Sequence, residues 1–213
     1  MSPKKALLVL GGEPPTENIL NWHHDDADFS VAVDSGWHPF QHADLIPDIL
    51  IGDFDSIEQV EDFNFPEVVE ILNDKNQNKS DFEKAIDYIL SLEVKLKEIV
   101  VLGALGGRID HLLNNFSLIC SLPEDIIVTI DSANEWGRRI TNQTPVEIKG
   151  QKGATISLIP MISCKSVVTS GLKWNLFKQD LQWGNFTSLS NICSNDFSEV
   201  KLESGNLFVL VQK

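Results

Sequence analysis

The 213-residue chain is short of cysteine, of basic residues and of long apolar stretches. Cys120, Cys164 and Cys193 are odd in number and lack the paired spacing of a metal site, so we expect reduced thiols packed in the fold of a cytoplasmic protein. Lysine and arginine number 17 against 31 aspartates and glutamates, and the net charge of −14 argues against binding to nucleic acid or to an anionic membrane. The apolar stretch from Ala6 to Leu10 is too short for a signal peptide or a membrane span, and no other stretch reaches membrane length.

Apolar residues are plentiful but come in short runs. At 42% hydrophobic, the chain can bury a core, which excludes disorder. In the first half, β-type runs alternate with helical patterns, which predicts an α/β domain with a mostly parallel sheet and flanking helices. The runs are Ala6 to Leu10, Ser30 to Val33, Ile49 to Ile51, Val68 to Leu72, Ile99 to Leu102 and Ile126 to Ile130. After about residue 132 only short strands separated by Gly, Pro, Asn and Ser remain, so we expect an α/β domain over 1–132 and an all-β domain over 133–213.

Three local elements can be placed from the sequence. Ser80 and Glu83 form a Ser-x-x-Glu capping box. The helix that it begins should bury the apolar residues that follow at helical spacing, which are Phe82, Ala85, Ile86, Ile89 and Leu90. A second helix is expected from about Ile109 to Cys120, with a buried stripe formed by Leu112, Leu113, Phe116 and Ile119. Strands from Val200 to Leu202 and from Leu207 to Val211, joined through Ser204-Gly205-Asn206, predict a hairpin.

Glycines and carboxylates follow the β-type runs. The segments are Gly11-Gly12, Asp34-Ser35-Gly36, Gly52-Asp53-Phe54-Asp55-Ser56, the glycine-rich stretch 103–107, and Asp131. Because parallel strands end at one edge of their sheet, we expect these segments to gather there, where α/β proteins bind ligands. Asp53 and Asp55 would point to the same side of an extended chain and could share one Mg²⁺. The alternative is an ordinary loop in which Asp and Ser cap turns.

Two further aspartates, Asp81 and Asp110, lie at expected helix starts, beside Lys84 and Arg108. Carboxylates for Mg²⁺ interleaved with cations for phosphate are what phosphoryl transfer requires, because its transition state spreads negative charge over oxygens. Both aspartates also have an ordinary explanation, since negative charge is favourable near a helix N-terminus. The segment 103–108 either offers backbone amides to a phosphate or is a tightly packed turn. It matches neither the P-loop nor the dinucleotide-binding motif.

Taken together, these motifs resemble the thiamine pyrophosphokinase family nearly from end to end. The resemblance rests on Gly11-Gly12, Asp34-Ser35-Gly36, Gly52-Asp53-Phe54-Asp55-Ser56, Gln77 with Ser80-Asp81-Phe82-Glu83-Lys84-Ala85, Gly106-Gly107-Arg108-Ile109-Asp110-His111, Gly171-Leu172-Lys173-Trp174 and Ser188-Leu189-Ser190-Asn191. The Gly-Asp-Phe-Asp-Ser and Gly-Gly-Arg-x-Asp-His blocks, in this order, are its most specific part.

The resemblance implies a fold, a reaction and an assembly. The implied fold has an N-terminal α/β catalytic domain and a C-terminal β-sandwich that binds thiamine. The implied reaction moves the pyrophosphoryl group of ATP to the hydroxyl of thiamine, giving thiamine diphosphate and AMP, with Mg²⁺ as cofactor. The implied assembly is a homodimer with active sites between subunits.

The resemblance also implies roles for single residues. Asp53, Asp55 and Asp81 match the magnesium and phosphate region and, with Asp110, are the implied catalytic residues. Nucleotide binding is implied for Gly11, Gly12, Asp34, Ser35, Gly36, Lys84, Gly106, Gly107 and Arg108. Trp174 matches the aromatic residue on which thiamine stacks, although by itself it would be interpreted as a core residue. Gln77, Ser188, Ser190 and Asn191 match the rest of the thiamine pocket.

Three positions depart from the family pattern. Trp37 stands where a small residue is usual, Asn76 where an acidic residue is frequent and Ser80 where threonine is common. Serine keeps the helix cap, whereas we expect Trp37 and Asn76 to border the nucleotide or thiamine pocket and to affect substrate preference. The segment His23-His24-Asp25-Asp26 is interpreted as a solvated turn, and no function is assigned to it or to His38 and His42.

Two other functions stay open at this point. A phosphatase or phosphotransferase would form an aspartyl phosphate at Asp53 with Asp55 as the acid. Its signature needs that pair after the first strand, whereas here the pair follows the third. A nucleotide or thiamine sensor without turnover is the other function, and the presence of all four acids together with Lys84 and Arg108 weighs against it.

Overall fold

The computed structural model describes residues 4–52, 70–73, 78–185 and 188–213, which form two compact units. The first unit comprises Met1–Leu118 and Ile130–Ala133, and the second comprises Ile119–Thr129 and Asn134–Lys213. The segment 119–129 therefore belongs with the second unit although it precedes residue 132. Six residues singled out in the sequence motifs lie outside the described residues: Asp53, Phe54, Asp55, Ser56, Asn76 and Gln77. The start of the predicted run from Val68 to Leu72 also lies outside them.

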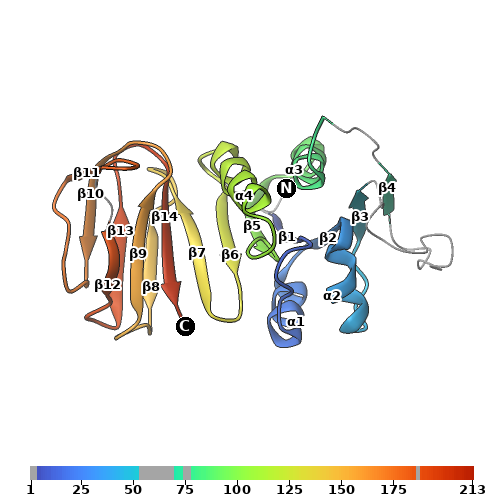
Figure 1. Cartoon of the computed structure of the whole chain (residues 1–213), viewed down its shortest axis with the longest axis horizontal. Helices are drawn as coiled ribbons and strands as arrows, with labels where there is room; N and C mark the ends of the chain where they lie inside the picture. The colour runs from blue at the N-terminus through green and yellow to red at the C-terminus, as the bar shows by residue number, and fades with distance from the viewer. Residues whose placement is uncertain (1–3, 53–69, 74–77, 186–187) are drawn as a thin grey trace. The chain divides into compact units, whose positions relative to one another are not determined.

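The first unit is built on a parallel sheet (Figure 1). Its strands have the order β5-β1-β2-β3-β4, and each neighbouring pair is parallel. The bounds are β1 Lys4–Val9, β2 Phe29–Val33, β3 Ile49–Gly52, β4 Glu70–Asn73 and β5 Leu96–Leu102, and β6 is Ile127–Asp131. These strands confirm the predicted α/β fold with a mostly parallel sheet.

Helices cover both faces of this sheet. They are α1 Glu17–Asp26, α2 Trp37–His42, α3 Asp81–Ser91 and α4 Ile109–Ser121, with a 3₁₀ helix η1 at Asp34–Gly36. Leu50 of β3 packs in one hydrophobic cluster with Leu20 of α1 and Phe40 of α2. The next strand residue, Ile51, points to the opposite face, where it lines a pocket with residues of α3. Burial from both sides explains why β1, β2, β3 and β5 contain continuous apolar runs, whereas β4 is mostly exposed.

The helix that begins at Ser80 is confirmed with its cap. The Ser80 hydroxyl accepts a hydrogen bond from the backbone N–H of Glu83 at 3.3 Å. Four of the five predicted core residues of α3 are buried, whereas Leu90 is 42% exposed, so its assignment to the buried face was wrong. The stripe of α4 was also partly wrong. Ile119 is buried, but Leu113 is 56% exposed.

The second unit contains two antiparallel sheets, as the all-β pattern predicted (Figure 1). One sheet has the order β12-β9-β14-β7 and the other β11-β10-β13-β8. The bounds are β7 Glu135–Ile140, β8 Val146–Lys149, β9 Thr155–Pro160, β10 Cys164–Ser170, β11 Gln179–Leu181, β12 Ser188–Ile192, β13 Phe197–Lys201 and β14 Leu207–Gln212.

The predicted terminal hairpin is wrong. β13 pairs with β8 and β10, whereas β14 pairs with β7 and β9, so the two strands belong to different sheets. The turn through Gly205 therefore carries the chain from one sheet to the other. Gly205 has φ 113°, and a Cβ there would lie 2.5 Å from the carbonyl oxygen of Ser163, which explains the glycine.

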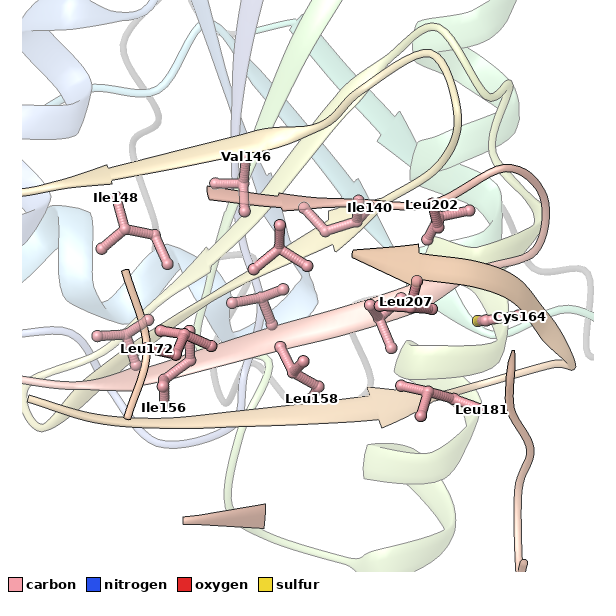
Figure 2. Close-up of a cluster of buried hydrophobic side chains, with 14 of the residues drawn as sticks. Ile140, Val146, Ile148, Ile156, Leu158, Cys164, Leu172, Leu181, Leu202 and Leu207 are labelled. Carbon is pink, nitrogen blue, oxygen red and sulfur yellow. The ribbon is translucent and has the colours of Figure 1, made fainter. Parts of the chain in front are cut away.

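The two sheets share one hydrophobic core (Figure 2). Ile156 and Leu158 of β9 and Leu207 of β14 enter it from one sheet, and Val146 and Ile148 of β8 enter it from the other. Alternate residues along β8 and β9 are buried, which is the period expected when one face of each strand faces a sandwich core. The C-terminal unit is thus a β-sandwich.

Candidate active site

A pocket of about 390 Å³ lies in the first unit, at the carboxyl ends of the parallel strands. Four stretches of chain meet there: the loop after β1, the start of η1 after β2, the N-terminus of α3, and the glycine-rich segment with the first turns of α4. The lining residues are Leu10, Gly11, Gly12, Val33, Asp34, Ser35, Ser80, Asp81, Phe82, Gly103, Ala104, Gly106, Gly107, Arg108, His111, Asn114 and Asn115. Eight of them are residues that the sequence singled out for nucleotide binding or catalysis.

The glycines hold two loops in close contact. The backbone N–H of Gly12 donates to the carbonyl oxygen of Gly103 at 2.9 Å, and the N–H of Glu13 donates to that of Leu105 at 2.6 Å. A Cβ on Gly12 would lie 2.4 Å from both carbonyl oxygens, so no larger residue fits. Gly106 has φ 78°, in the left-handed region that favours glycine. The glycine-rich segment is therefore a tightly packed turn that also lines the pocket.

The residues of the segment Asp34-Ser35-Gly36 have two roles: the first two line the pocket, and the third packs against β1. Asp34 and Ser35 line the pocket, and Asp34 has φ 47°, which is uncommon outside glycine. Gly36 is buried and does not line the pocket, and a Cβ there would lie 1.9 Å from the carbonyl oxygen of Val9. Gly36 thus allows η1 to approach β1 closely.

Asp81 and Lys84 form an ion pair on α3. The Lys84 ammonium donates to Asp81 Oδ1 at 2.8 Å, and Lys84 is only 6% exposed. Asp81 lines the pocket described above, whereas Lys84 lines a second pocket of about 360 Å³ with Ile51 and Tyr88. A buried ammonium is retained when a carboxylate compensates its charge, and Asp81 supplies that charge.

Arg108 and Asp110 form a second ion pair at the start of α4. Arg108 donates from Nε to Asp110 Oδ1 at 3.1 Å and from Nη2 to Oδ2 at 2.6 Å. The hydrogen bond from Arg108 lowers the pKa of Asp110, and Asp110 in turn raises the pKa of Arg108. Arg108 lines the pocket and Asp110 does not, so Asp110 reaches the site through the guanidinium that it holds.

Four polar pocket residues received no role from the sequence: Ser80, His111, Asn114 and Asn115. Ser80 was noted only as a helix cap, and His111 only as part of a motif. His111, Asn114 and Asn115 are three and four positions apart, which places them on one face of a helix. This spacing, at the start of an expected helix, was the signal in the sequence that could have placed these three residues together at the site.

Trp174, in the second unit, is held by Asn191. The backbone N–H of Trp174 donates to Asn191 Oδ1 at 3.1 Å, and Asn191 Nδ2 donates to the Trp174 carbonyl oxygen at 2.7 Å. Asn191 is buried, whereas the Trp174 side chain is 56% exposed. The interpretation of Trp174 as a core residue is therefore wrong, because its indole is available to a ligand.

A lysine lies over this indole. The ammonium of Lys173 is 4.5 Å from the centroid of the Trp174 ring, within the range of a cation–π contact. The indole face thus already attracts a positive charge.

Ser190 precedes Asn191 on β12. It has φ 54°, and its backbone N–H donates to the Ser157 hydroxyl at 3.0 Å. Ser188 begins the same strand and pairs with Leu158.

Trp37 does not line the pocket of the first unit, and the interpretation of His23 as part of a solvated turn is wrong. Trp37 is 5% exposed and packs in the core of the first unit, where its large ring fills space between α2 and the sheet. It is not among the residues that line the pocket of about 390 Å³. His23 lies in the last turn of α1 rather than in a solvated turn, and it is buried.

The partner of His23 is Asp131. His23 Nε2 is 2.9 Å from Asp131 Oδ2. Asp131 is not among the residues that line the pocket, so the structure does not bring it together with the glycines at that site.

No group of three or more His, Cys, Asp or Glu side chains that could hold a metal ion occurs among the described residues. Two of the three predicted ligands, Asp53 and Asp55, lie outside that part of the chain, so the metal site stays a prediction. None of the described helices is long and apolar enough to cross a membrane.

Comparison with known proteins gives matches over most of the chain. Residues 21–130 match the family described as thiamin pyrophosphokinase, catalytic domain, and residues 143–207 match thiamin pyrophosphokinase, vitamin B1 binding domain. Thiamine pyrophosphokinase 1 of Oryza sativa subsp. japonica is 30% identical over 96% of this chain and 86% of its own length. Thiamine pyrophosphokinase 2 of Arabidopsis thaliana is 29% identical over 96% of this chain and 85% of its own.

Solved structures share the fold. The crystal structure of thiamine pyrophosphokinase from Bacillus subtilis superposes with a TM-score of 0.83 at 22% identity, covering 99% of both chains. That of the yeast enzyme gives a TM-score of 0.81 at 18% identity, covering 100% of this chain and 87% of the other. The shared fold and the two matched domains define a two-domain enzyme of the kinase class. The chain belongs to the thiamine pyrophosphokinase family.

Proposed function

We propose that this enzyme uses magnesium and ATP to convert thiamine to thiamine diphosphate, releasing AMP. The observation that carries the proposal is the pocket of the first unit, in which two glycine loops, an acidic helix start and Arg108 converge. Its volume of about 390 Å³ is within the range of small-ligand sites. The family membership supports the kinase over the aspartyl-phosphate phosphatase and over the sensor without turnover.

In this proposal the pocket holds the ATP phosphates. Arg108 is largely exposed at its wall, and its planar guanidinium suits phosphate oxygens. The glycine-rich turn adds backbone N–H groups, which favour an anion where several face one space. Gly11, Gly12, Asp34 and Ser35 form another part of the lining. These contacts offset the acidity of a chain whose net charge is −14.

Magnesium would be held by Asp53, Asp55 and Asp81. Carboxylate oxygens are the donors that Mg²⁺ prefers, and the Asp81 carboxylate fits because it faces the pocket at the N-terminus of α3. Its Oδ1 also accepts from Lys84, so Asp81 serves two cations in the loaded enzyme. When bound, the metal neutralises negative charge on the transferring phosphates.

Thiamine would stack on Trp174. Its thiazolium carries a positive charge, and attraction to an indole face is worth roughly 0.5 to 2 kcal/mol. Asn191 supports this role because it fixes the backbone from which the indole projects. Gln77, Ser188 and Ser190 would complete the pocket by hydrogen bonding to the uncharged pyrimidine ring of thiamine.

The proposed step is an in-line displacement. A bond forms between the thiamine hydroxyl oxygen and the β-phosphorus of ATP, and the bond from that phosphorus to the oxygen shared with the α-phosphate breaks. AMP leaves with that oxygen, and the hydroxyl proton is released. Positioning supplies most of the rate in such a reaction. Arg108, held by Asp110, would orient phosphate oxygens for the attack.

The direct test is product analysis. Purified protein is incubated with thiamine and Mg-ATP, and the products are identified by mass spectrometry. Thiamine diphosphate with an equal amount of AMP is expected, whereas thiamine monophosphate with ADP would mean a single-phosphate kinase. Absence of any thiamine-dependent product would contradict the proposal. Arg108→Gln should lose most turnover, while Arg138→Gln in the second unit is the matched control.

The metal site is tested by Asp53→Ala, Asp55→Ala and Asp81→Ala. Each should abolish Mg²⁺-dependent turnover. Asp53→Ala and Asp55→Ala should do so while the protein stays folded, whereas Asp81→Ala also removes a carboxylate partner of the buried Lys84 ammonium and should lower stability. Asp87→Ala is the control, because Asp87 lies on α3 but outside the pocket lining and pairs with Lys79. Full activity in both Asp53→Ala and Asp55→Ala would remove the shared-metal hypothesis.

The proposal includes a homodimer with active sites between subunits, and a cytoplasmic location. Sedimentation showing only monomer at assay concentrations would contradict the dimer. Mixing Arg108→Gln with Trp174→Ala protein tests the shared sites. If each site combines the first unit of one subunit with the second unit of its partner, mixed dimers regain one intact site. Cell fractionation tests the location, which the three unpaired cysteines support.

A further inference from the structure

Two adjacent asparagines on α4 contact two different parts of the pocket lining. Asn114 Nδ2 donates to the hydroxyl oxygen of Ser80 at 3.2 Å. Asn115 Nδ2 donates to the carbonyl oxygen of Ala104 at 3.1 Å. All four residues line the pocket. One turn of one helix therefore connects the start of α3 with the turn that follows β5.

The wall contacted by Asn114 carries the acidic group of the site. Ser80 is the N-cap of α3, and its hydroxyl also accepts from the backbone N–H of Glu83 at 3.3 Å. Asp81 follows directly as the first residue of the helix. A hydrogen bond to the cap residue restrains the position of this helix start, and hence of the Asp81 carboxylate.

The wall contacted by Asn115 carries the glycine-rich turn. Ala104 is 2% exposed and follows Gly103, whose carbonyl oxygen accepts from the N–H of Gly12. Gly103 and Gly106 have positive φ, so the turn has a backbone conformation that few residues adopt. The Asn115 side-chain amide holds one carbonyl oxygen of this turn. The backbone N–H groups of the turn take no part in that contact.

We propose that Asn114 and Asn115 are positioning residues with separate tasks: Asn114 holds Asp81 in place, and Asn115 holds the phosphate-binding turn. This inference rests on the proposed function, in which Asp81 binds metal and the turn binds ATP. Neither asparagine contacts the reacting atoms in this account. Each acts through the wall to which its amide donates.

The two tasks predict different kinetic effects. Asn114→Ala should lower kcat and raise the Mg²⁺ concentration needed for half-maximal rate, with little change in the KM for ATP. Asn115→Ala should raise the KM for ATP with less effect on the Mg²⁺ requirement. Loss of one neutral hydrogen bond corresponds to roughly fivefold in either constant. Equal effects of both variants on kcat, KM and Mg²⁺ requirement would overturn the division of tasks.

Control variants separate positioning from general damage. Ser117→Ala changes an exposed residue of the same helix outside the pocket lining and should leave all three constants unchanged. If Asn114 acts through Ser80, then Asn114→Ala should add little to the effect of Ser80→Ala. Additive effects of the two changes would contradict this route.

Amide hydrogen exchange supplies a test that needs neither substrate. Asn114→Ala should speed exchange in the first turn of α3, including the Glu83 amide, and Asn115→Ala should not. If wild-type protein makes no thiamine diphosphate, the proposed function fails, but this exchange pattern still tests the contact. Unchanged exchange in α3 of Asn114→Ala would overturn the positioning role even in an active enzyme.

Discussion

The guanidinium of Arg139 donates from Nη1 to the carbonyl oxygen of Leu122 at 2.6 Å, just beyond the C-terminal end of α4. The same side chain donates to the carbonyl oxygens of Ile119, Pro123 and Ile126 at 3.1, 2.6 and 2.7 Å. Arg139 is fully buried. Its positive charge lies where the carbonyl groups of a helix end concentrate negative charge, and it donates to four carbonyl oxygens, of which those of Ile119 and Pro123 also accept a backbone N–H.

Arg139→Met should therefore destabilise the protein strongly. The substitution keeps much of the apolar stem but leaves the buried carbonyl oxygens of Leu122 and Ile126 without the guanidinium donor, which costs about 3 to 5 kcal/mol. The thermal midpoint should fall by roughly 6 to 20 °C. Calorimetry measures this, with Arg138→Met as the control, since Arg138 is only half-buried. Equal losses in both variants would show that the four carbonyl contacts contribute little.

Trp174→Ala should weaken thiamine binding and leave ATP binding nearly unchanged. Loss of the indole face removes a cation–π attraction, so the Kd for thiamine should rise between about twofold and thirtyfold. Isothermal titration with each substrate measures this. Trp183→Ala is a matched control, because Trp183 is similarly exposed in the same unit. Equal loss of affinity for both ligands would favour a structural role for Trp174.

Lys173→Met should raise the affinity for thiamine. The Lys173 ammonium lies 4.5 Å from the centre of the Trp174 ring, so a cationic ligand on that face must displace it. Removing the competing charge should lower the Kd for thiamine by about twofold or more, while Lys173→Arg keeps the competition. Titration of both variants checks this, and an unchanged Kd in Lys173→Met would mean that thiamine uses the other face.

The Arg108–Asp110 pair should persist into acid. The pKa of Asp110 is lowered by its hydrogen bond from Arg108, so the carboxylate is ionised throughout the neutral and mildly acidic range. The stabilisation is present above the unfolded pKa of Asp110 and disappears only as pH falls through the lower, folded pKa. A carboxyl NMR titration should give Asp110 a pKa below its ordinary value of 3.8, and Arg108→Gln should return it toward that value. An unshifted wild-type value would mean that the pair is not formed in solution.

Features with a local cause were predictable from the sequence. The start of α3 depends on Ser80 and Glu83, which are three residues apart. The meeting of Gly12, Ser35 and Gly106 at one pocket followed from a general property of parallel sheets, whose strand ends share an edge. The local pattern was enough in both cases because neighbouring residues, or strand direction alone, determine the geometry.

Features that depend on distant partners could not be predicted. The contact of His23 with Asp131 joins residues 108 positions apart, so nothing near His23 indicated its burial. A turn through Gly205 looks the same whether it joins two strands of one sheet or crosses between sheets. Only the pairing of β13 with β8 and β10, and of β14 with β7 and β9, distinguishes the two. The asparagines of α4 were missed because their acceptors belong to other elements.

The place of β14 between β7 and β9 affects how the protein is made. Both flanking strands hydrogen-bond to β14, which is the last strand of that sheet to be synthesised. On the ribosome, the first unit can complete its parallel sheet early, whereas β7 and β9 wait with open edges until Leu207–Gln212 has emerged. Open strand edges are where chains associate wrongly, so we expect the β-sandwich to be open to wrong association until β14 has emerged.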